Sequence, residues 1–90
     1  MSRILVLDDD AQFGDLIKIL LEMEGYQVTV LQVPEKMIPV ASQIDPALIL
    51  MDVHVASVET FDLLLAVKAN ADLKDVPVVM TSGLNYSAKC

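Results

Sequence analysis

The sequence lacks most of the features that would tie a protein to an oxidising compartment, a nucleic acid or a membrane. Its single cysteine, Cys90, has no partner for a disulfide within the chain, so we expect a reducing, cytoplasmic setting. Lysine and arginine number six against 13 acidic residues, and the net charge of −7 argues against direct binding of nucleic acid. The first apolar run, Ile4 to Leu7, has four residues and is too short for a signal peptide or a membrane span.

Aromatic residues and glycine are also scarce, whereas aliphatic residues are abundant. Aromatic residues make up 4% of the chain, glycine occurs three times and tryptophan is absent, while 54% of the residues are hydrophobic. This composition predicts a globular protein with an aliphatic core rather than a disordered chain. With 90 residues the chain has room for one small domain, and we treat residues 1–90 as that domain.

Apolar runs and helical periodicities alternate along the chain. The order strand, helix, strand, helix, strand, helix, strand predicts a parallel sheet with right-handed crossovers and helices on both faces. Gly25 stands where a glycine C-cap is expected, and Pro39 falls inside the second helix, where an interior proline costs about 3 kcal/mol. A kink, a late start or a short helix is therefore expected there. The predicted strands are residues 4–7, 27–31, 47–51 and 76–80, and the predicted helices are residues 11–24, 34–44 and, from 58 or 59, up to 69.

Polar side chains follow three of the predicted strands at the points where the strands end. A run of aspartates follows the first strand, one aspartate ends the third, and two hydroxyl residues with a glycine follow the fourth. In parallel α/β sheets, ligands bind outside the carboxyl ends of the strands, next to the switch in strand order. The residues concerned are Asp8, Asp9 and Asp10, then Asp52, then Thr81, Ser82 and Gly83.

If the first and third strands are neighbours, Asp8, Asp9 and Asp52 converge. Three carboxylates so close together cannot all remain ionised unaided, so one pKa must rise or a divalent cation must bind. Oxygen ligands that leave positions for water and phosphate suit Mg²⁺. The alternative is that these aspartates are solvated loop residues or helix caps, and Asp10 fits the N-cap of the first helix.

The three strand-end segments together resemble the receiver domains of bacterial response regulators. The separations agree with that family along the whole stretch, with 43 residues from Asp9 to Asp52 and 30 from Asp52 to Ser82. The resemblance implies a flavodoxin-like, doubly wound parallel α/β sheet with strand order 2-1-3-4. The matching segments are residues 4–10 for the first strand and acidic pair, 46–53 for the third strand and phosphoacceptor, and 75–83 for the fourth strand and switch hydroxyl.

The resemblance also implies roles for individual residues. Asp52 is expected to accept a phosphoryl group from a sensor histidine kinase or a phosphotransfer protein, as part of a two-component phosphorelay. Beyond self-phosphorylation and self-dephosphorylation, no enzyme activity is implied. The implied ligands of Mg²⁺ (or Mn²⁺) are Asp8, Asp9, Asp52 and the backbone carbonyl of His54, while Ser82 is the switch hydroxyl and Thr81 and Gly83 are its neighbours at the phosphate site.

The sequence departs from the family in two places. It ends before the family's fourth helix, fifth strand and fifth helix, and no residue stands at the family's essential lysine, because Lys89 lies too close to Ser82. We therefore expect a partial receiver with impaired phosphorylation, which self-associates, for example as a dimer, through the faces left uncovered. In the loop after Asp52, Ala56-Ser57 replace a common Pro-Gly and Thr60 replaces a common glycine, so this loop is expected to follow a different path.

Two other functions fit part of the pattern. One is a receiver-like module that works through protein contacts and is never phosphorylated, which the missing lysine favours. The other is a fragment of a haloacid-dehalogenase-type phosphatase, with Asp8 as nucleophile and Asp10 as acid, which leaves Asp52 unexplained. The residue that carries the phosphoryl group distinguishes these functions.

Overall fold

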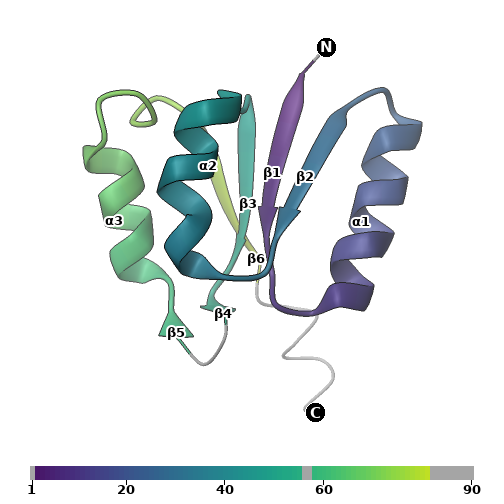
Figure 1. Ribbon diagram of the computed structural model, residues 1–90, viewed down its shortest axis with the longest axis horizontal. Coiled ribbons are helices and arrows are strands. Elements are labelled where there is room, and N and C mark those ends of the chain that lie inside the picture. Colours follow the sequence, from purple (N-terminus) through teal and green to yellow (C-terminus); the bar gives the residue numbers. More distant parts are fainter. Residues whose placement is uncertain (1, 56–57, 82–90) are drawn as a thin grey trace.

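Four apolar segments pair into one parallel sheet in the computed structural model, which describes residues 2–55 and 58–81 (Figure 1). The strand order is β2-β1-β3-β6, as the order 2-1-3-4 predicted for the first four sheet strands. β6 lies two residues further along the chain than expected at its start, because residues 76 and 77 precede the paired segment. The strands are β1 (Arg3–Leu7), β2 (Gln27–Leu31), β3 (Leu48–Asp52) and β6 (Val78–Thr81).

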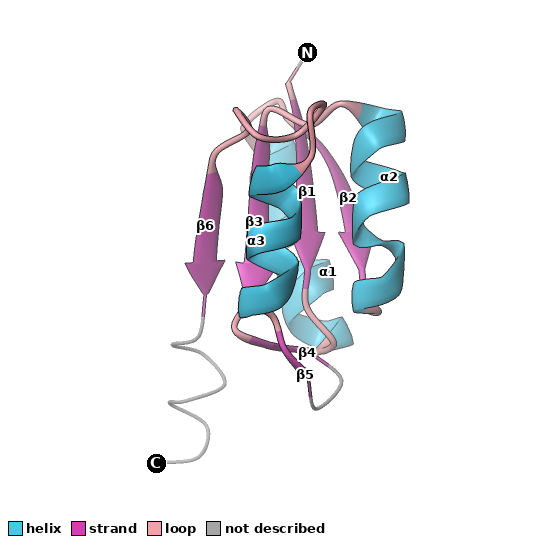
Figure 2. Cartoon of the chain, turned by 90° about the vertical axis from the view of Figure 1, so that its left-hand side faces the viewer, coloured by secondary structure: helices cyan, strands magenta, loops and turns pink. Residues whose placement is uncertain are grey.

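Helices cover both faces of this sheet, as predicted. α1 lies on one face, and α2 and α3 lie together on the other (Figure 2). Among the described residues, no helix combines the length and the apolar character needed to cross a bilayer. The helices are α1 (Ala11–Met23), α2 (Met37–Ile44) and α3 (Phe61–Ala69), and a short 3₁₀ turn, η1 (Pro34–Lys36), leads into α2.

Pro39 delays the second helix and keeps it short. The predicted segment begins as a 3₁₀ turn, and α2 starts only at Met37 and has eight residues. Pro39 thus falls in the first turn of α2, where a backbone N–H has no acceptor within the helix. The missing donor costs no helical hydrogen bond there. The late start and short length expected from the sequence are both confirmed.

The core has two layers because the central strands are buried on both faces. Toward α2 and α3, Leu5 and Leu7 of β1 pack with Ile49 and Met51 of β3, and all four are fully buried. Toward α1, the alternate residues of β1 pack with Val28 of β2. A strand buried on both sides needs a continuous apolar run, which explains why β1 and β3 were recognisable in the sequence.

Two glycines set the position of α1. Gly25 has φ of 96° and follows the helix, as the predicted C-cap requires. Gly14 faces β2 at such close range that a Cβ placed on it would lie 2.8 Å from Cγ1 of Val30. The backbone of α1 at Gly14 therefore lies directly against the Val30 side chain of β2.

The segment after β3 differs from the sequence-based expectation. Residues 58 and 59 were predicted as the start of the third helix, but they form β5 (Val58–Glu59), which pairs antiparallel with β4 (His54–Val55). The backbone N–H of Thr60 closes this ribbon by donating to the carbonyl of Val53 at 2.9 Å. α3 consequently begins at Phe61, because residues 58–60 are hydrogen-bonded in the ribbon.

Candidate functional site

Parallel pairing brings the predicted acidic residues to one edge of the sheet. Leu7 of β1 stands opposite Met51 of β3, so the residues that follow them, Asp8 and Asp52, emerge side by side. Asp52 in turn stands opposite Thr81 of β6. All three strands end here in the same direction. The carboxyl edge of the sheet therefore carries the site that the sequence placed there.

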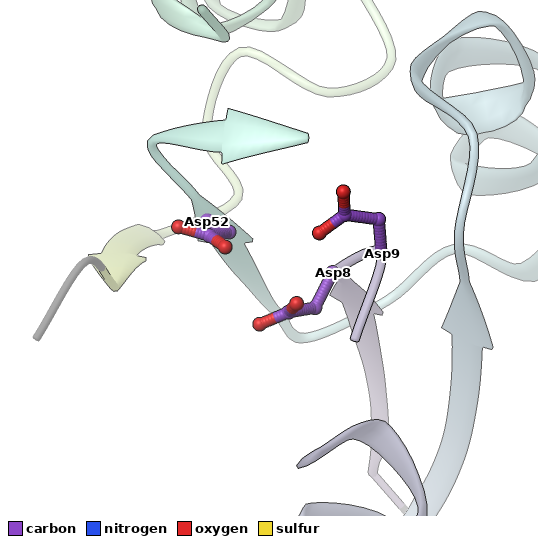
Figure 3. Close-up of side chains that lie close together, drawn as sticks. All are labelled: Asp8, Asp9 and Asp52. Atoms are coloured by element: carbon purple, nitrogen blue, oxygen red, sulfur yellow. The ribbon is translucent and has the colours of Figure 1, made fainter. Parts of the chain in front are cut away.

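Three carboxylates converge at this edge (Figure 3). Carboxylate oxygens of Asp8, Asp9 and Asp52 all lie within 4.8 Å of one another. Asp8 and Asp52 are buried, with 3% and 2% of their surface exposed, whereas Asp9 is exposed. The predicted convergence is confirmed. We call these three residues the acidic pocket.

The acidic pocket raises the pKa of Asp8. Burial raises the pKa of its carboxyl group, and the charges of Asp52, Asp9 and Asp10 add to that rise. The backbone N–H of Asp10, which donates to Oδ1 of Asp8 at 2.9 Å, opposes it by stabilising the ionised form. The backbone of Asp8 is fixed as well, since its N–H donates to the carbonyl of Leu31 at 3.0 Å. Removing the proton from Asp8 is therefore costly unless positive charge is nearby.

Asp10 has a different role from its two neighbours. Its carboxylate accepts hydrogen bonds from the backbone N–H groups of Gln12 and Phe13, at 3.0 and 3.2 Å. This is the N-cap of α1, as the alternative based on helix capping predicted. The run of three aspartates thus contains two pocket residues and one capping residue.

The β4–β5 ribbon begins next to Asp52. The N–H of His54 donates to Oδ1 of Asp52 across 3.4 Å, a long bond. Because the N–H of Thr60 donates to the carbonyl of Val53, the next pair in the antiparallel ladder, His54 and Glu59, falls at a non-hydrogen-bonded position. The ladder therefore does not use the carbonyl of His54. On the exposed side of the pair, Nε2 of His54 lies 3.4 Å from Oε1 of Glu59.

Thr60 is the residue near the site that the sequence-based interpretation missed. Only 1% of its surface is exposed, and its hydroxyl group donates to the backbone carbonyl of Asp52 at 2.6 Å and reaches that of Val53 at 3.0 Å. In the sequence it appeared only as a departure from a common glycine. Its φ of −95° is open to any residue, so a glycine is not required here.

The predicted hydroxyl side of the site is described only in part. Thr81 ends β6 and is partly buried opposite Asp52. Ser82 and Gly83, predicted as switch hydroxyl and phosphate-site neighbour, lie outside the described residues, as do Ala56 and Ser57 of the loop.

The donor chemistry of the acidic pocket fits a divalent cation. Three carboxylate groups supply several oxygen donors within coordination range of a common centre. Burial, together with the nearby charges of Asp52 and Asp9, raises the pKa of Asp8, so a cation in the pocket would favour its ionised form. Mg²⁺ prefers oxygen ligands of this kind and completes its shell with water. The residues present therefore suit Mg²⁺.

Comparison with known proteins identifies the family. Residues 4–89 match the model of the response regulator receiver domain. The chain belongs to this family of receivers. Two curated relatives are the transcriptional regulator RpaA of Synechocystis, 36% identical over 93% of this chain, and the response regulator MtrA of Mycobacterium tuberculosis, 30% identical over 88%. The receiver covers only 35% and 33% of their respective lengths.

Solved structures support the same fold. The N-terminal receiver domain of a response regulator from Methanoculleus marisnigri has a TM-score of 0.82 and 26% identity, covering 89% of this chain and 65% of that one. The chemotaxis regulator CheY4 of Vibrio cholerae has a TM-score of 0.83 over 97% of this chain and 76% of its own, and at 22% identity it shows the fold alone.

Membership of this family excludes one of the functions considered from the sequence, the phosphatase. Receivers are not a family of catalytic enzymes, and in general they interact with histidine kinases in two-component signalling. The phosphatase alternative is therefore wrong. Asp10, its required acid, instead caps α1. The acidic pocket is that of a receiver.

Proposed function

We propose that this receiver accepts a phosphoryl group on Asp52 from the phosphohistidine of a sensor histidine kinase or phosphotransfer protein. The observation that carries the proposal is the acidic pocket itself, in which Asp52 lies buried beside Asp8 with Asp9 at the rim. A protein scaffold gains nothing from clustered carboxylates, because burying like charges costs free energy. We also propose that residues 1–90 act as one receiver unit and do so in the cytoplasm.

The transfer requires a carboxylate oxygen aimed at phosphorus. An oxygen of Asp52 forms the new P–O bond as the P–N bond to the histidine breaks, and the electron pair of that bond returns to the imidazole. The product is an acyl phosphate. Orientation accounts for much of the rate in such transfers. The N–H of His54, which donates to Oδ1 of Asp52, supports one orientation of the nucleophile.

A divalent cation completes this proposal. We assign Asp8, Asp9, Asp52 and the backbone carbonyl of His54 as the groups that would hold Mg²⁺ or Mn²⁺. When bound, the cation offsets negative charge on the transferred group. Asp8 would contribute as a carboxylate, a form that the N–H of Asp10 favours by donating to Oδ1. We further propose Ser82 as the switch hydroxyl, with Thr81 and Gly83 beside it.

Intact mass spectrometry tests the proposal. The protein is incubated with Mg²⁺ and a small acyl phosphate, with Asp52→Asn as the site variant and Asp62→Asn as a matched control, because Asp62 is an exposed aspartate in α3. The expected result is one phosphoryl adduct in the wild type and the Asp62 variant, absent from the Asp52 variant and from wild type in a chelator. A folded wild-type protein that gains no adduct contradicts the proposal.

A second candidate function is a phosphorylation-independent interaction module, and one surface favours it. α1 presents a group of apolar side chains that are 48–77% exposed, which we call the α1 apolar surface. Val79 on the same side of the sheet is 47% exposed, whereas its neighbours Val78 and Met80 pack toward α2 and α3. Contiguous exposed apolar area marks interaction sites. The α1 apolar surface consists of Leu16, Ile19, Leu20 and Met23.

We propose self-association through this surface, tested by sedimentation velocity over a range of concentrations. The Leu20→Glu variant is expected to contain a larger fraction of monomer than the wild type at the same concentration. Gln12→Glu, which adds a charge at an exposed position of the same helix, is expected to leave the distribution unchanged. A wild-type protein that remains monomeric at all concentrations rules out this function.

A further inference from the structure

Thr60 occupies the N-cap position of α3 but does not cap the helix. Its carbonyl accepts the N–H of Leu64 at 2.9 Å, as an N-cap carbonyl should, yet its side chain makes no hydrogen bond to the first turn. Threonine at this position usually accepts a backbone N–H through its hydroxyl oxygen, which contributes about 1 kcal/mol. In this protein the hydroxyl group is turned inward instead. It is therefore engaged by something other than its own helix.

The group that engages it is the backbone of the proposed phosphoacceptor. The hydroxyl group donates to the carbonyl oxygen of Asp52 at 2.6 Å and lies 3.0 Å from that of Val53. The 2.6 Å bond is at the short end for O–H···O, and both ends of it are buried. This contact joins a side chain at the start of α3 to the last carbonyl of β3.

The same few residues hold the peptide that follows Asp52. The N–H of Val53 donates to the carbonyl of Thr81 at 3.2 Å, and the carbonyl of Val53 accepts the N–H of Thr60 at 2.9 Å. Thr60 thus contacts this stretch through two separate donors, its own N–H and its hydroxyl. Together they hold the two peptide groups that follow the Cα of Asp52.

We propose that Thr60 is a positioning residue for phosphoryl transfer, which holds the backbone of Asp52 so that its carboxylate keeps the orientation needed for attack. This rests on the proposed function of Asp52. The contact of Thr60 is with the backbone carbonyl of Asp52, so Thr60 acts on the carboxylate through the backbone. A displacement of about 1 Å at a reacting group can lower the rate on the order of 100-fold. Even a smaller displacement of the Asp52 carboxylate should therefore lower the rate of phosphoryl uptake measurably.

Three substitutions separate the hydroxyl group from the bulk of the side chain. Thr60→Ser keeps the hydroxyl and loses a methyl group. Thr60→Val keeps the shape and loses the donor, which leaves the carbonyl of Asp52 without this partner. Thr60→Ala also loses the donor but leaves space for a water molecule to satisfy the carbonyl, so it should fold even if the valine variant does not.

The first readout is the rate of phosphoryl uptake in Mg²⁺, followed by intact mass at several concentrations of a small acyl phosphate. The maximal rate of Thr60→Val is expected to fall about 10-fold or more, with the half-saturating donor concentration near that of wild type. Thr60→Ser is expected to restore most of the rate. A folded Thr60→Val, or a folded Thr60→Ala if the valine variant unfolds, that reaches the wild-type maximal rate overturns the proposal.

The second readout does not depend on phosphorylation. The amide of His54 donates to the carboxylate of Asp52, so its NMR shift and hydrogen exchange report the position of that side chain. They are expected to change in Thr60→Val and to stay near wild type in Thr60→Ser. If the wild type takes up no phosphoryl group, the proposed function fails while this measurement still decides whether Thr60 positions Asp52. If uptake occurs and neither readout responds to the valine substitution, only the role of Thr60 is refuted.

Discussion

Replacing Gly14 with alanine tests how closely α1 is held against β2. A Cβ at this residue would lie 2.8 Å from Cγ1 of Val30, inside the 3.4–4 Å of ordinary contact. At an unobstructed helical site the change is stabilising by about 1 kcal/mol, because alanine is the better helix former. Here the methyl group must displace Val30 or the helix, and overpacking of this kind costs about 1–3 kcal/mol. We therefore expect a net loss of up to about 2 kcal/mol in the free energy of unfolding.

Val30 has few ways to yield. It is β-branched, which restricts its rotamers, and it precedes Leu31, whose carbonyl accepts the N–H of Asp8 at 3.0 Å. A displacement of β2 would therefore also move Asp8 in the acidic pocket. In Gly14→Ala/Val30→Ala the obstacle is gone, and the two changes should show a favourable coupling of about 1–3 kcal/mol.

Urea unfolding followed by far-ultraviolet circular dichroism gives the free energy of unfolding of the wild type, Gly14→Ala, Val30→Ala and the double variant. Gln12→Ala, at an exposed position of α1, serves as the control for alanine in this helix. The reasoning is refuted if Gly14→Ala raises the free energy of unfolding, or if the double variant shows no coupling. Either result would mean that α1 does not rest on β2 through the glycine.

The remaining predictions concern the pocket, the helix cap and the core. The folded-state pKa of Asp8 is raised, so its contribution to stability is greatest below the ordinary pKa and is lost as the pH rises through the folded-state value. Asp8→Asn should therefore stabilise the metal-free protein near neutral pH and flatten the dependence of its melting temperature on pH. Mg²⁺ should stabilise only the wild type. A metal-free wild type whose stability rises steadily as the pH rises from the ordinary pKa of aspartate toward neutrality would contradict this. Asp10→Ala should lose about 1 kcal/mol in urea unfolding while Asp10→Asn, which can still cap α1, stays near wild type, and both should retain phosphoryl uptake. Met37→Ala, at a fully buried residue, should cost about 2–5 kcal/mol, whereas Met23→Ala, at a residue 77% exposed, should change stability by less than about 0.5 kcal/mol, and equal effects would mean that the core is misassigned.

Much of the fold was predictable because its signals are local. β1 and β3 are continuous apolar runs, which is what burial on both faces requires, and their aspartates follow directly. Asp8 and Asp52 were brought together by one further inference, that the first and third strands are neighbours. That inference follows from the topology of parallel α/β sheets rather than from any single residue.

The ribbon after Asp52 was not predictable, because its cause is not local. Val58 and Glu59 suit the first turn of a helix as well as they suit a strand. They form β5 because the backbone of Thr60 pairs with Val53, a contact seven residues apart that no helical periodicity reports. The inward direction of the Thr60 hydroxyl is hidden for the same reason, since threonine before a helix normally predicts a cap.

The acidic pocket and Thr60 have one property in common, which is that neither follows the arrangement that local stability alone would favour. Asp8 and Asp52 bury like charges that asparagine would not carry, and Thr60 forgoes a capping bond worth about 1 kcal/mol. The hydroxyl of Thr60 instead bonds the carbonyl of Asp52, and under the proposed function a cation in the pocket would offset the charge of the aspartates. Substitutions that stabilise the metal-free protein at Asp8 or Asp52 should therefore reduce phosphoryl uptake, the trade-off expected where a site is arranged for chemistry rather than for folding.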